Sequence, residues 1–169
     1  MPFLNKDYIC IKNIITMKIN PKIGIDQLIF GMKQKDVIAI YGNPDKEYKD
    51  EESNVIFLYD SKKLRLTFYE DENLKLGYMI SSNPDLELFS EKIIGKQIDE
   101  VEKNVTSKGI KSLEIESFDT VDNYFNESNW IIFQVEYKEV IRFELGATIN
   151  DKDDFDWKFK GQYNTKCVS

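Results

Sequence analysis

The residues of this chain whose types and spacing could support catalysis, metal binding or partner binding are concentrated in three acidic runs. They comprise Asp50, Glu51 and Glu52 in "DEES", Glu70, Asp71 and Glu72 in "EDEN", and Asp151, Asp153, Asp154 and Asp156 beside Trp157 in "NDKDDFDW". Carboxylates in such numbers can bind a metal ion, act as general acids and bases, or contact the Lys and Arg side chains of a partner. The surrounding sequence distinguishes these three roles.

The spacing of the acidic residues does not suit a metal ion. A calcium loop needs carboxylates at alternate positions, then Gly and a distant Glu, but Phe155 and Trp157 occupy the alternate positions of the last run. The chain contains no histidine, which removes Ser-His-Asp and Cys-His catalysis and most zinc sites. We therefore expect no bound metal and no cofactor.

Catalysis by carboxylates alone is the remaining enzymatic alternative. Pairs such as Glu114 with Glu116, or Glu136 with Glu139, could act as acid and base. Such pairs arise by chance in a chain with 30 acidic residues. There is also no Gly-rich phosphate loop, no C-x-x-C pair and no nucleophile elbow. We expect the protein not to be an enzyme, and a small catalytic domain that uses carboxylates is the third interpretation.

The overall charge favours a basic protein as the partner. The net charge is −7 and the pI is about 4.8, whereas nucleic acids and anionic membranes are bound by clustered Lys and Arg. We therefore predict neither nucleic-acid nor membrane binding. Acidic turns at a sheet edge can cover a cationic active site by replacing substrate phosphates. The three acidic runs and Trp157 are accordingly the predicted partner-binding residues, and a surface that is acidic only for solubility is the alternative.

The N-terminal residues do not form an export signal. Lys6, Asp7 and Lys12 interrupt the apolar residues, so no continuous h-region is present. No run approaches the roughly 18 apolar residues that cross a bilayer.

Cys10 and Cys167 lie near opposite ends and are expected to be reduced thiols rather than a disulfide. The expected location is the cytoplasm.

Two helix-plus-strand units are expected to position the acidic runs. Segment 31–42 begins and ends with a glycine around apolar residues at helical spacing, and segment 95–109 repeats this plan. Gly31 and Gly95 are 64 residues apart, and Leu74 and Val140 are 66 apart, which indicates an internal duplication. Alternating apolar residues predict strands at 54–59, 63–69 and 74–80 after the first helix, and at 112–118, 129–137 and 140–146 after the second.

We therefore predict an α+β fold of two tandem helix-plus-antiparallel-sheet repeats in one domain. The helices should lie on one face of the combined sheet, with the other face open. The predicted divisions are an N-terminal extension (1–22), repeat 1 (23–84), repeat 2 (85–149) and an acidic C-terminal tail (150–169), and residues 1–16 could add an edge strand. The residues expected to be buried are Val37, Tyr41, Phe68, Leu76, Val101, Val105, Phe133 and Phe143.

The segment "IGIDQLIFGMKQKDVIAIYGNPDKEY" resembles a signature of small bacterial proteins with a tandem-repeat β-lactamase-inhibitor-like fold and of related outer-membrane assembly lipoproteins. Lys33 stands where Ser or Thr usually caps the helix. The later segments "LELFSEKIIGKQIDEVEKNVTSKGI" and "WIIFQVEYKEVIRFELG" resemble, more narrowly, immunity proteins found beside polymorphic toxins, including those of contact-dependent growth inhibition. The resemblance covers about residues 17–149, and its matching residues are Gly24, Phe30, Gly31, Met32, Asp36, Val37, Gly42 and Pro44.

This resemblance implies an immunity protein that binds and neutralises a cognate toxin domain by covering its active site or substrate-binding surface. A nuclease is the favoured toxin, because its phosphate-binding surface is basic and this chain is acidic. The alternative is a periplasmic or envelope lipoprotein-like assembly or inhibitor module of the same fold, which the missing signal sequence disfavours. If the acidic runs do not form the interface, the open sheet face with Arg65, Thr67 and Tyr69 is the next candidate.

Overall fold

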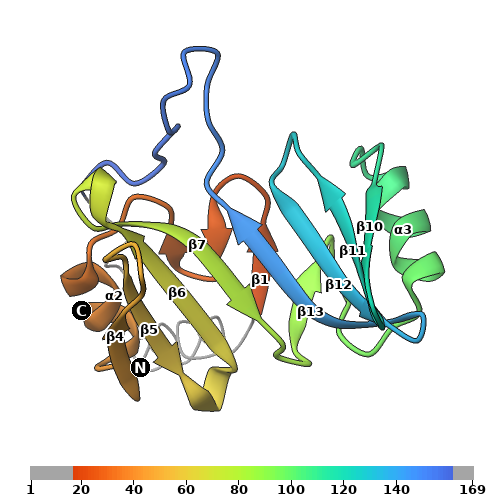
Figure 1. Ribbon diagram of the computed structural model, residues 1–169, viewed down its shortest axis with the longest axis horizontal. Helices are drawn as coiled ribbons and strands as arrows, with labels where there is room; N and C mark the ends of the chain where they lie inside the picture. Colours follow the sequence, from red (N-terminus) through yellow and green to blue (C-terminus); the bar gives the residue numbers. More distant parts are fainter. Residues whose placement is uncertain (1–16, 162–169) are drawn as a thin grey trace, which may run out of the picture.

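An eight-stranded antiparallel sheet forms the body of the computed structural model, which describes residues 17–161 (Figure 1). The strand order is β10-β11-β12-β13-β7-β6-β5-β4, so two four-stranded meanders meet where β7 pairs with β13. The strands are β4 (Lys46–Lys49), β5 (Val55–Tyr59), β6 (Leu64–Tyr69), β7 (Lys75–Ser81), β10 (Glu114–Phe118), β11 (Val121–Asn126), β12 (Ile131–Glu136) and β13 (Glu139–Gly146).

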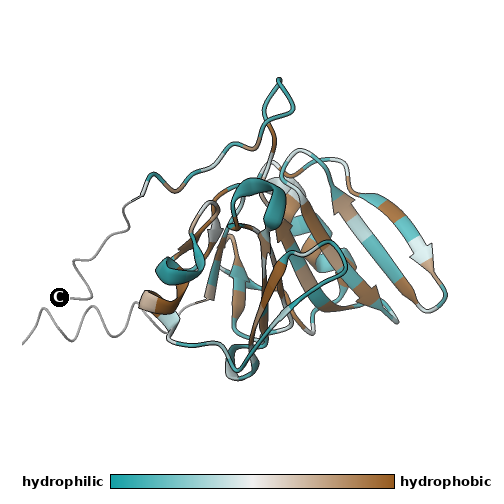
Figure 2. Ribbon diagram, turned by 60° about the vertical axis from the view of Figure 1, so that its left-hand side comes forward, coloured by the Kyte–Doolittle hydropathy of each residue, from teal (hydrophilic) through white to brown (hydrophobic). Residues whose placement is uncertain are grey.

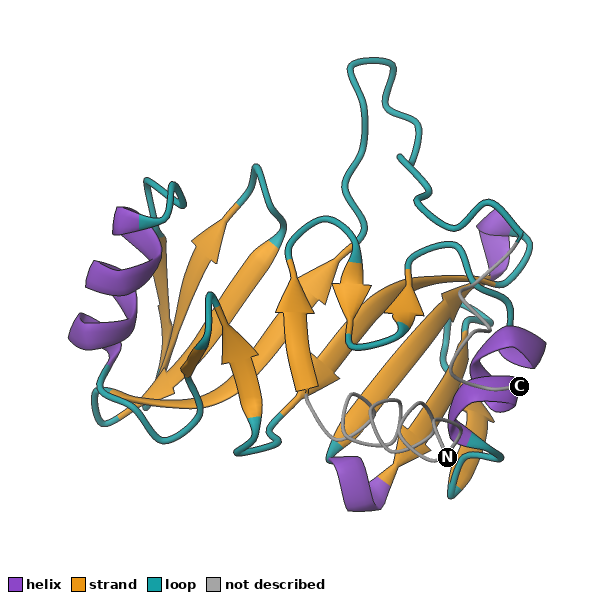
Figure 3. Cartoon of the chain, turned by 180° about the vertical axis from the view of Figure 1, so that it is seen from behind, coloured by secondary structure: helices purple, strands orange, loops and turns teal. Residues whose placement is uncertain are grey.

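A smaller sheet packs against the middle of the large one (Figure 3). It consists of β1 (Met17–Asn20), β2 (Gly24–Ile25), β3 (Leu28–Ile29), β8 (Leu86–Leu88) and β9 (Glu91–Lys92), in the order β3-β2-β1-β8-β9. Strand β1 pairs in parallel with β8, and the apolar residues of both join the same core as Phe68, Phe133 and Phe143 of the large sheet. One face of the large sheet is thereby covered.

The two α-helices within residues 17–161 lie at opposite ends of the described structure (Figures 1 and 3). Helix α2 (Gln34–Tyr41) begins where the carboxylate of Asp36 accepts a hydrogen bond from the Lys33 backbone N–H at 2.9 Å. It ends at Gly42, whose φ of 78° favours glycine. Helix α3 (Ile98–Ser107) buries the apolar stripe Ile98, Val101 and Val105. Two short 3₁₀ helices, η1 (Asp60–Lys62) and η2 (Glu70–Glu72), form the β5–β6 and β6–β7 turns.

The predicted fold of two helix-plus-sheet repeats with the helices on one face is wrong. The described part of the chain is mostly β, with 43% strand and 17% helix, and its strands form two sheets. Helices of eight and ten residues are only about 12 and 15 Å long, whereas eight strands span about 34 Å, so the helices cannot cover the large sheet. The small sheet occupies that position, and its strands of two to four residues are too short to show an alternating pattern.

Several single elements were predicted correctly. All six predicted strand segments are strands, and both predicted helices are present. Seven of the eight residues expected in the core are buried, while Tyr41 is half-buried because its hydroxyl donates to Asp26 at 2.9 Å near the surface. Strand β4 was missed because "KEYK" is exposed throughout, and β11 was missed because "VDNYFN" is largely polar.

The N-terminal part of the chain contributes to the fold from Met17 onward. Strand β1, which was assigned to the N-terminal extension, lies in the middle of the small sheet. The edge strand predicted within 1–16, and both Cys10 and Cys167, lie outside the described residues. Within residues 17–161, no helix has the length and apolar character needed to cross a membrane.

Candidate functional site: an acidic end of the large sheet

Two of the predicted acidic runs are joined by one buried side chain, Asn54. The Asn54 Nδ2 donates to Oδ2 of Asp50 at 3.1 Å and to Oε2 of Glu52 at 3.3 Å. Its Oδ1 accepts a hydrogen bond from the backbone N–H of Glu70 at 3.0 Å. The β4–β5 turn and η2 are therefore fixed beside each other at one end of the large sheet. Lys33 also binds this end, because its ammonium donates to the backbone carbonyl of Asn73.

The third acidic run reaches the same end through aromatic contacts. Residues 148–156 form a protruding hairpin, closed by the bridge between Ile149 and Phe155, with a hydrophilic tip (Figure 2). The centre of the Phe155 ring lies 5.6 Å from that of Tyr69, the residue directly before η2. The Phe155 ring also stacks on Trp157, with the ring centres 4.8 Å apart. The chain then passes the residue that follows β3, because the Phe159 N–H donates to the carbonyl of Phe30 at 3.0 Å. We call the three runs together the acidic end.

Two of the predicted carboxylates have clear structural roles. Oδ1 of Asp50 accepts the backbone N–H groups of Glu52 at 2.9 Å and of Asn54 at 3.0 Å. Desolvation opposes ionisation of Asp50, but the hydrogen bonds from Asn54 and Glu52 outweigh it and lower its pKa. The Lys158 ammonium donates a hydrogen bond to Oδ2 of Asp156 at 2.6 Å. This hydrogen bond and the positive charge of Lys158 lower the pKa of Asp156.

Other carboxylates of the acidic end are available to a partner. Within residues 17–161 their side chains make no hydrogen bond or ion pair, and all except the half-buried Glu72 are exposed. Asp153 has a left-handed backbone, with φ 60°, at the hairpin tip. Glu70 is also exposed, although its backbone N–H binds Asn54. The available set is Glu51, Glu70, Asp71, Glu72, Asp151, Asp153 and Asp154.

Trp157 holds the C-terminal segment against the body of the protein. It is half-buried, it stacks on Phe155, and the Lys75 ammonium lies 5.4 Å from the centre of its ring. A Cβ on Gly31 would lie 3.3 Å from the Trp157 Cβ, so the segment crosses this glycine closely. The exposed apolar residue of the hairpin is Ile149, which is 51% exposed and was not predicted as a site residue.

The acidic residues do not form a metal site in the part of the chain that the structure describes. No group of three Asp, Glu, His or Cys side chains is placed to hold a metal ion there. The expectation that the protein needs no metal or cofactor remains a prediction.

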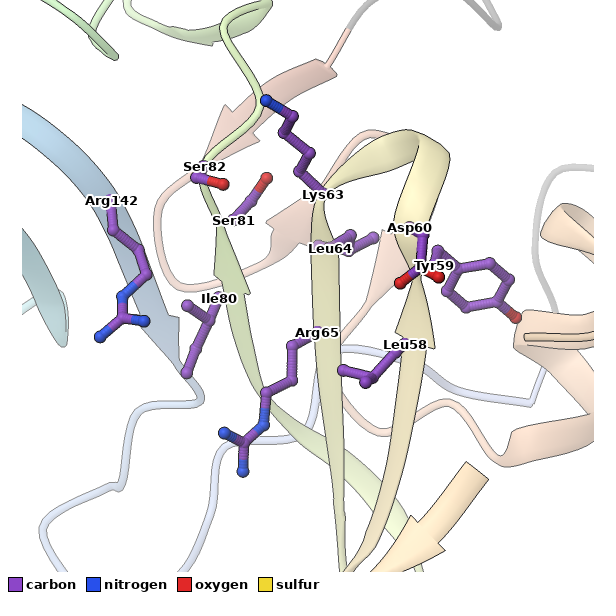
Figure 4. A pocket seen from close by; sticks show the side chains of 10 residues that line it. All are labelled: Leu58, Tyr59, Asp60, Lys63, Leu64, Arg65, Ile80, Ser81, Ser82 and Arg142. Carbon is purple, nitrogen blue, oxygen red and sulfur yellow. The ribbon is translucent and has the colours of Figure 1, made fainter. Parts of the chain in front are cut away.

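Sequence reasoning missed a pocket on the open face of the large sheet (Figure 4). The pocket has a volume of about 440 Å³ and contains Arg65 and Arg142, which are the only arginines of the chain. That rarity was the signal that could have identified it. The other residues named for this face are less accessible, since Thr67 is buried and Tyr69 lies between Phe155 and Gly77.

No family model and no curated protein matches the sequence. Solved structures with a similar arrangement include an extracellular protein containing an SCP domain from Bacillus anthracis, with 10% identity and a TM-score of 0.47 over 69% of this chain and 43% of that one. A cysteine-rich secretory protein from Staphylococcus aureus has 13% identity and a TM-score of 0.43 over 69% and 44% of the two chains. A DUF4309 family protein from Bacillus subtilis has 10% identity and a TM-score of 0.46 over 85% and 94%. This chain spans less than half of the first two proteins, and these similarities carry no functional argument.

Proposed function

We propose that this protein is a cytoplasmic immunity protein that neutralises a toxin domain by binding the toxin's basic surface with the acidic end. The observation that supports this proposal is the convergence of three acidic runs, whose outermost residues Asp50 and Asp156 are 106 positions apart in sequence, at one end of the large sheet. Asn54 and Phe155 hold the runs together, so the carboxylates are positioned before a partner arrives. Preorganisation of this kind lowers the entropy lost on binding.

The available carboxylates are complementary in charge to the basic surface with which a nuclease binds phosphate groups. Their charge raises the rate of encounter with a cationic surface and selects against acidic partners. Ile149 offers an exposed apolar contact beside them, and interfaces commonly combine a desolvated apolar centre with a polar rim. A nuclease domain is therefore the proposed class of toxin.

The experiment combines toxicity with charge reversal. The toxin domain encoded beside this gene is co-expressed with the wild-type protein or with the triple variant Glu51→Lys, Asp71→Lys, Asp151→Lys. The control reverses three exposed carboxylates at the opposite end of the sheet, Glu114→Lys, Glu116→Lys and Glu127→Lys, and so changes the net charge equally.

We expect the wild-type and control proteins to protect the cells and the triple variant to fail, with all three proteins folded by circular dichroism. Equal protection by the two triple variants would show that the acidic end is not the interface. The absence of any toxin gene, or an envelope-assembly operon in its place, would favour the envelope-module alternative.

A further inference from the structure

The two arginines of the chain flank strand β7 on the open face of the large sheet. Arg65 on β6 pairs with Ile80, and Ile80 pairs with Glu144 on β13, two residues after Arg142. Residues two apart on a strand share a face, so all four side chains lie on the same side. Figure 4 shows Arg65 and Arg142 on either side of Ile80 with their guanidinium groups pointing toward the same end of the sheet, whereas the Lys63 ammonium points the other way.

Arg65 has unused binding capacity. Among residues 17–161, no carboxylate oxygen lies within ion-pair distance of its guanidinium. Its Nε is buried and has no hydrogen-bond acceptor. Buried donors in folded proteins nearly always have a partner, and a donor without one is destabilising. An acceptor supplied from outside the chain would satisfy this group.

Arg142 is held only loosely. Its Nε lies 4.0 Å from Oε1 of Glu144, and its side chain is 46% exposed. The other carboxylate oxygen of Glu144 accepts a hydrogen bond from the Tyr78 hydroxyl at 2.5 Å. Burial and the neighbouring Glu144 raise the pKa of Tyr78, so this hydroxyl stays protonated and keeps Glu144 in place. The terminal nitrogens of Arg142 consequently remain available.

The spacing of the two arginines suits a ligand with two charged ends. Strands β6 and β13 are separated by β7, which places their backbones about 10 Å apart, and the offset of two residues adds about 7 Å along the strand. Ile80 lies between the two side chains, and Leu58 lines the pocket beside Arg65. Glu144, the cross-strand neighbour of Ile80, lies on the Arg142 side and is bound by the Tyr78 hydroxyl. The apolar side chains of Ile80 and Leu58 fit a hydrocarbon linker better than a further charged group.

We propose that this pocket binds a ligand with two carboxylate groups, one for each guanidinium, joined by an apolar stretch that lies on Ile80. Arg presents paired N–H donors whose geometry matches a carboxylate, and a second contact of this type adds both affinity and selectivity. The site does not depend on the proposed toxin binding, because it lies on the sheet face and uses none of the acidic runs. The two carboxylates can belong to a free dicarboxylic acid or to two acidic side chains of an extended peptide segment.

The test uses isothermal titration calorimetry with three probes on the full chain. Adipate carries two carboxylates, butyrate carries one, and the peptide acetyl-Glu-Val-Glu-amide places two on the same side of an extended chain. The variants are Arg65→Gln and Arg142→Gln. Lys103→Gln, which removes one positive charge from the exposed side of α3, is the control.

We expect adipate or the peptide to bind at least about tenfold more tightly than butyrate, because each charge-assisted contact contributes separately. Each arginine variant should reduce this affinity to that of butyrate, and Lys103→Gln should leave it unchanged. Tighter binding of adipate would assign the site to a free dicarboxylate, and tighter binding of the peptide would assign it to a protein segment. The proposal is overturned if neither probe exceeds butyrate, or if folded arginine variants bind as the wild type does; either result leaves the toxin-binding proposal unaffected.

Discussion

Replacement of Asn54 by alanine should destabilise the protein more than its single small side chain suggests. Asn54 is buried, and its amide group makes three hydrogen bonds, to Asp50, Glu52 and the backbone of Glu70. These bonds join the β4–β5 turn to η2, so the substitution removes a connection between two segments of the acidic end. The Glu70 N–H loses its acceptor at the same time.

The size of the effect follows from these three bonds. A hydrogen bond to a charged group contributes about 1.5–3 kcal/mol, and a neutral one about 1 kcal/mol. Glu52 is exposed and Asp50 is half-buried, so water replaces part of the loss on the two carboxylates. We expect the free energy of unfolding to fall by about 2–3 kcal/mol, which lowers the melting temperature of a chain of this size by about 5–10 °C.

Urea unfolding followed by circular dichroism measures this change. Asn43→Ala is the matched control, because Asn43 is exposed and its side chain makes no hydrogen bond within residues 17–161. The control should change the free energy of unfolding by less than about 0.5 kcal/mol. If Asn54→Ala falls within the same limit, the two turns are not held together by this side chain, and the preorganised acidic end loses its physical basis.

Three further predictions concern backbone strain, pH and metal. Gly31→Ala should cost about 1 kcal/mol more than Gly42→Ala in urea unfolding, because both need a positive φ but only the new Cβ at position 31 approaches Trp157, and equal costs would contradict this contact. Burial raises the pKa of Asp26 despite the hydrogen bond from Tyr41, so the folded state loses stability as pH rises above about 3.8. Asp26→Asn should therefore raise the melting temperature at pH 7 and have no effect well below pH 3.8, and a loss at pH 7 would refute this sign. Chelation should leave the melting temperature unchanged, and a large decrease would reveal a required metal.

The strands that were predicted from the sequence are those whose alternation is long enough to be visible. In β12, Ile131, Phe133 and Val135 point to the core and alternate with half-buried neighbours over six residues. By contrast, β2 and β3 each contain two residues, and they form because β2 pairs with β1 on one side and with β3 on the other. The small sheet could therefore not be predicted from local periodicity, and the position assigned to the helices was wrong as a result.

The acidic runs were visible in the sequence, but their proximity was not. It depends on the hydrogen bond between Asn54 and Glu70 and on the contact between Phe155 and Tyr69, which joins residues 86 positions apart. The arginine pocket has the same character, because Arg65 and Arg142 approach only through the pairing of β7 with β13. Side-chain contacts between distant segments therefore determine the acidic end, and long-range strand pairing determines the arginine pocket; neither can be predicted from residue spacing alone.

The rate of association with the toxin domain, measured by stopped-flow fluorescence at 50 and 500 mM NaCl, tests the central claim most directly. Screening shortens the range of charge attraction from about 14 Å to about 4 Å between these conditions. We predict that the rate constant for the wild-type protein falls at least about tenfold, and that the variant with Glu51→Lys, Asp71→Lys and Asp151→Lys is slow at both concentrations. A wild-type rate that is independent of salt, or that the triple variant matches at low salt, would contradict binding through the acidic end.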